Sequence, residues 1–192
     1  IEYEPKATID TNALVVYKKD SKGNLTLVKT SAYDPTTRTM VFYAEEGAEY
    51  VIGYNPISFK DTNMWAREYI SYLAARGIAQ GTGGANFEPH RSITRAEFLK
   101  LLVSILDNID LTEEKYSKSR FKDVKPEAWY ARYIEWAAEN KVVSGYGNGN
   151  FGPDDLITRQ EMAVMISNFV KAIGLDLKAE KAEMKFKDAA SI

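Results

Sequence analysis

Apolar residues follow a strand-like pattern in the first part of the chain and a helix-like pattern further on. Residues 13–19 and 25–29 are rich in apolar and β-branched positions and flank the glycine-containing turn DSKGN, which predicts a hairpin. Residues 39–45 and 49–54 flank another glycine turn and predict a second hairpin, with the loop YDPTTRT between the two pairs. We therefore expect residues 1–56 to form a small antiparallel β domain, or a fragment of a sandwich, without a candidate site of its own.

From residue 58 onward the apolar spacing is that of amphipathic helices. Two first helices are predicted from positions that share one helical face, namely Trp65, Tyr69, Ile70 and Leu73 in one and Trp129, Tyr133, Ile134 and Ala137 in the other. A second helix follows each after a glycine-rich loop, with apolar faces formed by Phe98, Leu101, Leu102, Ile105 and Leu106 and by Met162, Met165, Ile166 and Phe169. Each helix–loop–helix unit can bury only one face by itself, so the units must pack against each other.

The two helical units are copies, because residues 65–102 align without a gap with residues 129–166. Each copy opens with Phe-Lys-Asp, and a third such opening stands at residues 186–188. The chain is thus divided into the β region, repeat one with its connector, repeat two with its connector, and the start of a third repeat, with bounds 1–56, 57–120, 121–185 and 186–192. Within these bounds, residues 107–120 are a polar connector and residues 177–185 are a candidate short helix.

Composition excludes several classes of function. The formal net charge of -2 gives no electropositive field, so we expect no nucleic-acid partner. The chain lacks cysteine, which excludes thiol catalysis and cysteine-ligated metals, and it lacks an apolar run of about 18 residues, so we expect no membrane insertion. We expect no metal and no cofactor. Because the sequence opens at Ile1 without methionine or an apolar leader, we expect it to be a piece of a longer chain.

The pentapeptides ITRAE and ITRQE precede the second helix of each copy. Threonine followed three residues later by glutamate, directly before an apolar helix, is a capping box. Thr94 and Thr158 are the predicted N-caps, and Glu97 and Glu161 reach back to them. Folding alone therefore accounts for the threonine and the glutamate.

The arginine inside each pentapeptide is not explained by capping. Arg95 and Arg159 fall in the first helical turn, where the helix dipole disfavours a cation. A rule broken at equivalent positions of both copies indicates a functional site, and a guanidinium beside free helix N–H groups suits a carboxylate ligand. The alternative is an ion pair with Asp61 or Asp123 of a neighbouring unit, and the spacing favours neither reading.

Together these motifs resemble the S-layer homology family: Phe-Lys-Asp, then tryptophan, then the loops GIAQGTGGANFEP or VVSGYGNGNFGP, then ITRAE or ITRQE. The resemblance covers roughly residues 57–192. It implies an α+β chain in which a small β domain precedes all-α repeats, and repeats that assemble in threes as a pseudo-trimer with the first helices in a central bundle. Because the third repeat is incomplete, this pseudo-trimer would be incomplete, and self-association of the chain could complete it.

The resemblance also implies a function at the cell wall of Gram-positive bacteria, outside the cell. Grooves between such repeats bind secondary cell wall polysaccharide, an anionic, pyruvylated polymer attached to peptidoglycan. The residues that carry over as ligand-binding are Arg95, Arg159, Trp65, Trp129, Asp61, Asp123, Gly81, Gly83, Gly145 and Gly147. The chemistry fits, since indole rings cover apolar sugar faces and arginine pairs with a ketal carboxylate. Core packing is the alternative for the tryptophans, and turn geometry is the alternative for the glycines.

Three other functions were weighed from the residues. A calcium loop at 144–155 lacks the bidentate glutamate and two further ligands of an EF-hand. A glycan hydrolase needs two facing carboxylates, whereas most acidic residues are predicted caps or solvated positions and the single histidine, His90, has no copy in repeat two. A structural lattice module would use the repeats for protein assembly without binding glycan. We expect a non-enzymatic anchoring module.

Overall fold

The strands form two small antiparallel sheets. The computed structural model describes residues 1–112 and 114–175, and it is of the α+β class. A short 3-10 helix, η1 (Thr11–Ala13), leads into the strands, which are β1 (Leu14–Lys19), β2 (Leu25–Val28), β3 (Ala32–Asp34), β4 (Thr39–Val41) and β5 (Glu49–Tyr54). One sheet has the order β2-β1-β5 and the other pairs β3 with β4. The predicted first hairpin is confirmed, since Val16 on β1 lies opposite Val28 on β2.

The predicted second hairpin is wrong. β5 pairs with β1 rather than with β4, and residue 16 is flanked by Ile52 on that side. The stretch YDPTTRT does not separate two hairpins but forms the turn of the β3–β4 hairpin, in which Asp34 accepts hydrogen bonds from the Thr36 amide and the Thr37 hydroxyl, both at 2.8 Å. This turn makes β3 the local partner of β4, and β5 gains a six-residue ladder along the buried strand β1.

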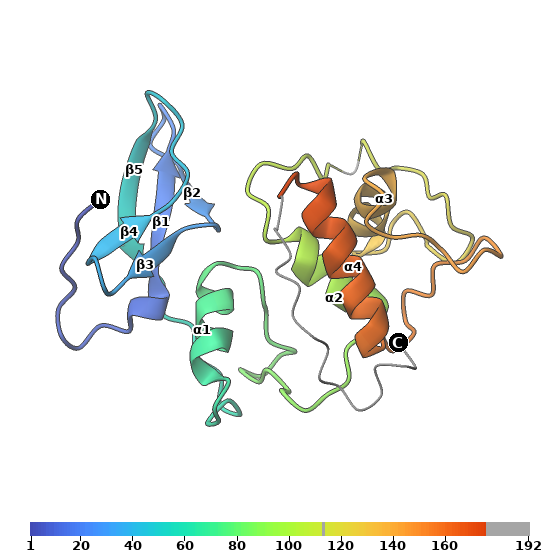
Figure 1. The fold of residues 1–192 in the computed structure, drawn as a ribbon, viewed down its shortest axis with the longest axis horizontal. Helices are drawn as coiled ribbons and strands as arrows, with labels where there is room; N and C mark the ends of the chain where they lie inside the picture. Colours follow the sequence, from blue (N-terminus) through green and yellow to red (C-terminus); the bar gives the residue numbers. More distant parts are fainter. Residues whose placement is uncertain (113, 176–192) are drawn as a thin grey trace, which may run out of the picture.

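The helices follow the predicted order. They are α1 (Arg67–Ala75), α2 (Arg95–Val103), α3 (Ala131–Glu139) and α4 (Arg159–Ala172). Figure 1 shows α1 beside the strands, and α2, α3 and α4 grouped at the other end of the molecule. α2 contacts both α3 and α4, whereas α1 contacts η1. The central bundle of first helices and the pseudo-trimer remain predictions, and both the start of a third repeat at 186–192 and the candidate helix at 177–185 lie outside the described residues.

The capping boxes are confirmed in both repeats. The Thr94 side chain accepts from the Glu97 amide, and the Glu97 carboxylate accepts from the Thr94 amide at 3.0 Å. Thr158 and Glu161 repeat the arrangement at the start of α4. Each second helix therefore begins at the residue that the sequence pattern predicts.

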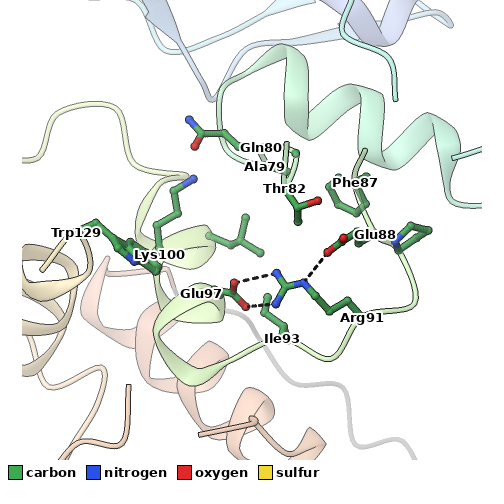
Figure 2. Close-up of a pocket in the computed structure, with 13 residues that line it drawn as sticks. Ala79, Gln80, Thr82, Phe87, Glu88, Arg91, Ile93, Glu97, Lys100 and Trp129 are labelled. Carbon is green, nitrogen blue, oxygen red and sulfur yellow. Dashed lines mark hydrogen bonds and ion pairs between the residues drawn. The ribbon is translucent and has the colours of Figure 1, made fainter. Parts of the chain in front are cut away.

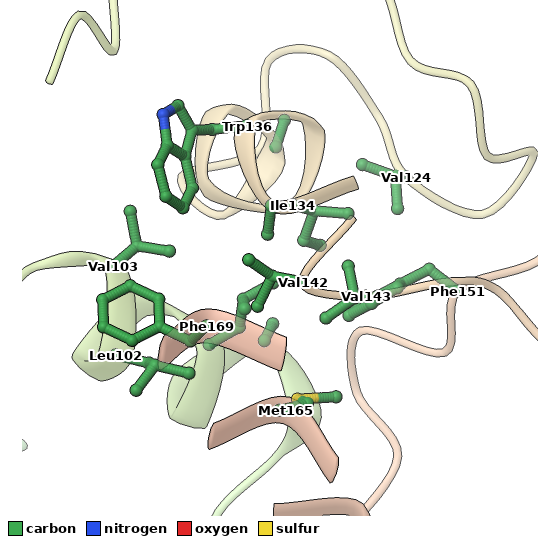
Figure 3. Packing of buried hydrophobic residues seen from close by; sticks show 14 of the residues in the cluster. Leu102, Val103, Val124, Ile134, Trp136, Val142, Val143, Phe151, Met165 and Phe169 are labelled. Carbon is green, nitrogen blue, oxygen red and sulfur yellow. The ribbon is translucent and has the colours of Figure 1, made fainter. Parts of the chain in front are cut away.

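The core is shared by the two repeats, as their one-sided helices require. Figure 3 shows side chains from α2, α3, α4 and the loop after α3 packed into one cluster. Its fully buried members include Leu99, Val103, Ile134, Val142 and Phe151. The described residues contain no helix with the length and apolar character needed to cross a membrane.

The first residues of the predicted helical faces do not belong to this core. Trp65 and Trp129 precede α1 and α3 instead of lying within them, and the two indoles are 82% and 54% exposed. Tyr69 is also exposed, whereas Ile70 and Ile134 are buried. The buried face of each first helix therefore starts later than the periodicity indicated, and core packing does not account for the tryptophans.

The connector between the repeats is packed rather than simply polar. Tyr116 is buried and donates to the Glu139 carboxylate at 3.1 Å. Glu135, buried on α3, accepts from the Ser119 hydroxyl at 2.7 Å and from the Arg120 amide and guanidinium at 3.0 and 2.8 Å. These contacts hold the connector on the outer side of α3.

A buried arginine is central to the contact between the strands and repeat one. Arg76 follows α1, is fully buried, and stacks on Tyr72 with its guanidinium carbon 3.5 Å from the ring centre. It donates to the carbonyls of Ser31, Asn12 and Leu14 at 2.7, 2.9 and 2.9 Å. Buried carbonyls need such donors, so Arg76 fixes α1 against the β region.

Candidate functional site

A groove of about 370 Å³ lies between repeat one and the residues that precede α3. The loop after α1 forms one wall, α2 forms the floor, and Trp129 of repeat two closes one side. We call it groove one, and Figure 2 shows Trp129 and Arg91 on opposite sides of it. Its lining residues are Ala79, Gln80, Gly81, Thr82, Phe87, Glu88, Pro89, Arg91, Ile93, Glu97, Lys100, Leu101 and Trp129.

The glycine-rich loops are tight hairpins held from within. The Thr82 amide donates to the Asn86 carbonyl at 2.9 Å, and the Tyr146 amide donates to the Asn150 carbonyl at the same distance. A side chain at Gly81 would come within 2.5 Å of the Asn86 carbonyl oxygen, and Gly145 is enclosed in the same way by residue 150 and the Phe121 ring. Turn geometry therefore accounts for these two glycines.

Gly83 and Gly147 lie at the tips of these hairpins. Both have positive φ, 121° and 84°, which a side chain would strain. Neither lines groove one. Of the four glycines predicted to bind ligand, Gly81 lines groove one and Gly145 lines its counterpart in repeat two.

The aspartates of the Phe-Lys-Asp motifs face the loops and line neither groove. Asp61 accepts from the amides of Phe87 and Glu88 at 2.8 and 2.7 Å. The hydrogen bond from Phe87, followed by that from Glu88, lowers the pKa of Asp61 although desolvation opposes the shift. Asp123 accepts from the amides of Phe151 and Gly152, both at 2.8 Å. Each motif thus fastens its own glycine-rich loop.

Arg95 is buried at the junction of the two repeats. Its Nη1 donates to the Glu161 carboxylate at 2.5 Å and its Nε donates to the Phe151 carbonyl at 3.2 Å. The guanidinium lies 4.7 Å from the centre of the Tyr146 ring. The acidic partner is thus the glutamate of the second capping box, and not Asp61 or Asp123 as the sequence-based alternative had it.

Backbone hydrogen bonds reinforce this junction. The amides of Arg95 and Ala96 donate to the carbonyls of Asp155 and Pro153 at 2.9 and 3.1 Å. The Ile157 amide donates to the Ile93 carbonyl at 3.2 Å. The start of α2 is therefore held by three backbone hydrogen bonds against the segment that precedes α4.

Arg159 has different surroundings from its copy. It is exposed at the start of α4 and forms no ion pair with a residue that the structure describes. Trp65, the copy of Trp129, lies edge-on to Tyr69 with ring centres 6.3 Å apart. Trp65 and Arg159 line neither groove.

A second cavity of about 510 Å³ occupies the equivalent position in repeat two. We call it groove two. Its lining residues are Arg95, Val142, Val143, Ser144, Gly145, Tyr146, Gln160, Glu161, Ala163, Val164, Met165 and Asn168. Arg95 reaches it from repeat one while remaining only 4% exposed. The one charged pair that lines groove two is thus internally neutralised, among the residues described.

Two cations that sequence reasoning did not single out line groove one. Arg91 pairs with Glu97 at 2.8 Å and with Glu88 at 3.3 Å. Lys100 donates from Nζ to the Ile78 carbonyl at 3.1 Å, and burial, followed by the charge of Lys29, lowers its pKa. Both residues are replaced in the second copy. The sequence analysis compared identical pairs, so it did not identify these two cations.

The described residues contain no group of three or more His, Cys, Asp or Glu side chains that could hold a metal ion. Among the described residues, the grooves offer apolar walls, loop backbone and one cation without an acidic partner, Lys100, and such a surface suits ligand recognition. The class defined by this fold and these grooves is a binding module built from repeated helical units.

The family of S-layer homology domains matches residues 58–99 and 120–163. The chain is 29% identical over 177 residues to the surface-layer 125 kDa protein of Lysinibacillus sphaericus, covering 88% of this chain and 14% of that protein. It is 32% identical over 109 residues to the cellulosome-anchoring protein of Acetivibrio thermocellus, covering 57% of this chain and 24% of the relative. It is 35% identical over 133 residues to the amylopullulanase of Thermoanaerobacterium thermosulfurigenes, covering 69% of this chain and 7% of the enzyme.

Residues 58–99 and 120–163 are two S-layer homology repeats. The chain spans less than a quarter of the length of each relative named above, so the enzyme's activity does not transfer with the similarity. No solved structure matches the chain significantly. The repeats and the surface-layer and anchoring relatives assign the chain to the cell wall or surface layer, outside the bacterial cell, and support a role in surface anchoring.

Proposed function

We propose that this chain is a non-enzymatic module that anchors a surface protein non-covalently to the cell wall by binding an anionic, pyruvylated secondary wall polysaccharide. The observation that carries the proposal is groove one, in which an exposed indole and the Lys100 ammonium group of α2 line the same cavity. Trp129 is 54% exposed although it is a large apolar ring. Carbohydrate rings present apolar faces that such an indole covers, while their hydroxyl groups reach polar side chains.

The ten site residues predicted from the family resemblance take different parts in this proposal. Trp129 and Gly81 line groove one, and Arg95 and Gly145 line groove two. Asp61, Asp123, Gly83 and Gly147 shape the loops that border the grooves. Trp65 and Arg159 are exposed, and in the proposed function they bind glycan only where a further repeat covers them.

The test is binding of the 192-residue chain to purified wall polysaccharide before and after chemical removal of its ketal groups. We expect the chain to bind the intact polymer. Binding should weaken as salt is added, because the protein cation and the ketal carboxylate form an ion pair. It should be markedly weaker after ketal removal. Trp129→Ala should weaken binding to the intact polymer, whereas Trp65→Ala serves as the matched exposed control. Equal binding to intact and ketal-free polymer would remove the acidic substituent from the proposal.

Self-association is a second candidate, and a specific contact favours it. The amides of Arg95 and Ala96 are used by repeat two, but their copies at 159 and 160 make no backbone hydrogen bond with a described residue outside α4. In a head-to-tail contact, these amides at the start of α4 can bind a second copy of the chain, which then presents the same amides to a third. Sedimentation of the chain without polymer separates this function, since assembly would then proceed with no glycan present.

A further inference from the structure

The two grooves are built from equivalent positions but differ in charge. Lys100 in groove one corresponds to Val164 in groove two, and Arg91 corresponds to Asp155, which does not line groove two. Asp155 accepts a hydrogen bond from the Tyr146 hydroxyl at 2.9 Å. Repeat two therefore has neither Arg91 nor Lys100 at the equivalent positions.

Within groove one the cations are in different states. Arg91 engages both carboxylates of the groove, Glu97 and Glu88, so its charge is already paired. Lys100 forms no ion pair with any residue in the described part of the chain, and its one protein acceptor is the Ile78 carbonyl. An ammonium group has three donors, so two of them are available to a ligand. This half-buried, unpaired charge is the feature that an anion would satisfy.

Among the residues that the structure describes, groove two has no such unpaired charge. Its cation, Arg95, already pairs with Glu161 and is 4% exposed. The position equivalent to Lys100 holds Val164, which is 59% exposed. A carboxylate entering groove two would meet an apolar surface and an arginine that is already neutralised, so its desolvation would not be offset.

We propose that Lys100 is the carboxylate-binding residue of this chain, and that an acidic saccharide binds in groove one and not in groove two. The inference rests on the proposed function and deepens it by assigning the acidic substituent to one residue. Trp129 covers the sugar ring while the Lys100 ammonium binds the carboxylate, both from the lining of the same groove (Figure 2). Desolvation lowers the pKa of Lys100 in the empty groove, and a bound carboxylate would favour its charged form again.

The experiment uses calorimetric titration of the 192-residue chain with two probes. One is a methyl glycoside carrying a pyruvate ketal, and the other is the same glycoside without the ketal. We expect one site per chain for the acidic probe. Lys100→Val, which installs the residue of the other copy, should weaken acidic-probe binding by about tenfold or more and change neutral-probe binding by less than about twofold. Lys100→Gln keeps a donor for the Ile78 carbonyl and should behave in the same way, which separates loss of charge from loss of folding.

Val164→Lys supplies the reciprocal test. We expect this variant to bind a second equivalent of the acidic probe, and the double variant Lys100→Val, Val164→Lys to bind one equivalent with shifts in the Tyr146 region of the NMR spectrum. Unchanged acidic-probe affinity in both Lys100 variants, or two sites in the parent chain, would overturn the assignment of Lys100 while leaving the anchoring proposal intact. If the parent chain binds neither probe nor the intact polymer, the proposed function itself fails.

Discussion

The two arginines of the repeated pentapeptide have equivalent positions and different environments. Arg95 lies between the repeats, where it holds the second capping box through Glu161 and reaches the Phe151 carbonyl. Arg159 is exposed at the start of α4. Within the described residues, the arginine is therefore a buried ion-pair partner in one copy and a solvated cation in the other. Substituting the two should change the stability of the protein by different amounts.

We predict that Arg95→Ala lowers the free energy of unfolding by about 2–4 kcal/mol, because it leaves a partly buried carboxylate without its partner. The matched variant Arg159→Ala should change it by less than about 0.5 kcal/mol. Urea denaturation of both variants gives the comparison. Similar midpoints for the two would show that Arg95 does not stabilise the junction.

At this scale the sequence predicted what depends on near neighbours. Both capping boxes were predictable because every atom involved lies within four residues. The partner of Arg95 was not, because it lies 66 residues away and is chosen by how the repeats stack. Lys100 was not identified because it is not repeated in the second copy, and the sequence analysis compared only residues that are identical in the two copies.

Among the elements, the Phe-Lys-Asp motif and the glycine-rich loop form one structural unit. The Lys60 and Lys122 amides donate to the carbonyls of Ala85 and Gly149 at 3.0 and 2.9 Å. The aspartate of each motif then binds two loop amides, as Asp123 does with Phe151 and Gly152. This unit sets the height of the loop above the second helix, and so the shape of the groove.

We predict that Asp123→Ala lowers the free energy of unfolding by about 2–3 kcal/mol, because two charge-assisted hydrogen bonds are lost. Amide exchange at Phe151 and Gly152 should accelerate at the same time. Asp154→Ala, which alters an exposed acid in the same loop, is the control and should shift stability by less than about 0.5 kcal/mol. Unaltered exchange at the two amides in Asp123→Ala would contradict the anchoring role of this carboxylate.

Element types were predictable, while element partners were not. Apolar stretches that flank glycine turns predicted the strand region, and helical periodicity predicted the four helices that the structure describes, because it depends on burial of one face. Which strand pairs with β5 is decided by the Asp34 turn, which makes β3 and β4 local partners. Trp65 and Trp129 fit the helical period but lie ahead of the helices, since a ring that continues a pattern need not be buried.

On the scale of the whole molecule, the β region and repeat one are a connected body. Arg76 donates into the β region at three carbonyls, and the Asp107 carboxylate accepts from the Lys29 and Thr30 amides at 2.6 and 3.3 Å. The Asn55 side-chain amide donates to the Ala75 carbonyl at 2.7 Å. The sequence analysis gave Arg76 no role, because its three acceptor carbonyls lie 45, 64 and 62 residues away along the chain.

We predict that Arg76→Ala lowers the free energy of unfolding by about 3 kcal/mol or more, because buried carbonyls lose their donor. The strands should then unfold at lower urea than the helical core. Arg67→Ala, an exposed arginine on the same helix, should leave one cooperative transition. Probes placed in the strands and near Ile134 report the two parts separately, and coincident transitions in the Arg76 variant would refute the coupling.

The buried guanidinium of Arg76 also decides how mechanical load would travel in an anchored protein. Tension on β1 or β5 reaches α1 through hydrogen bonds that act in parallel with the covalent chain at Asn55. The connection between strands and helices is therefore rigid. A force on the β region would be transmitted directly to the repeats, whereas a flexible linker would first have to extend.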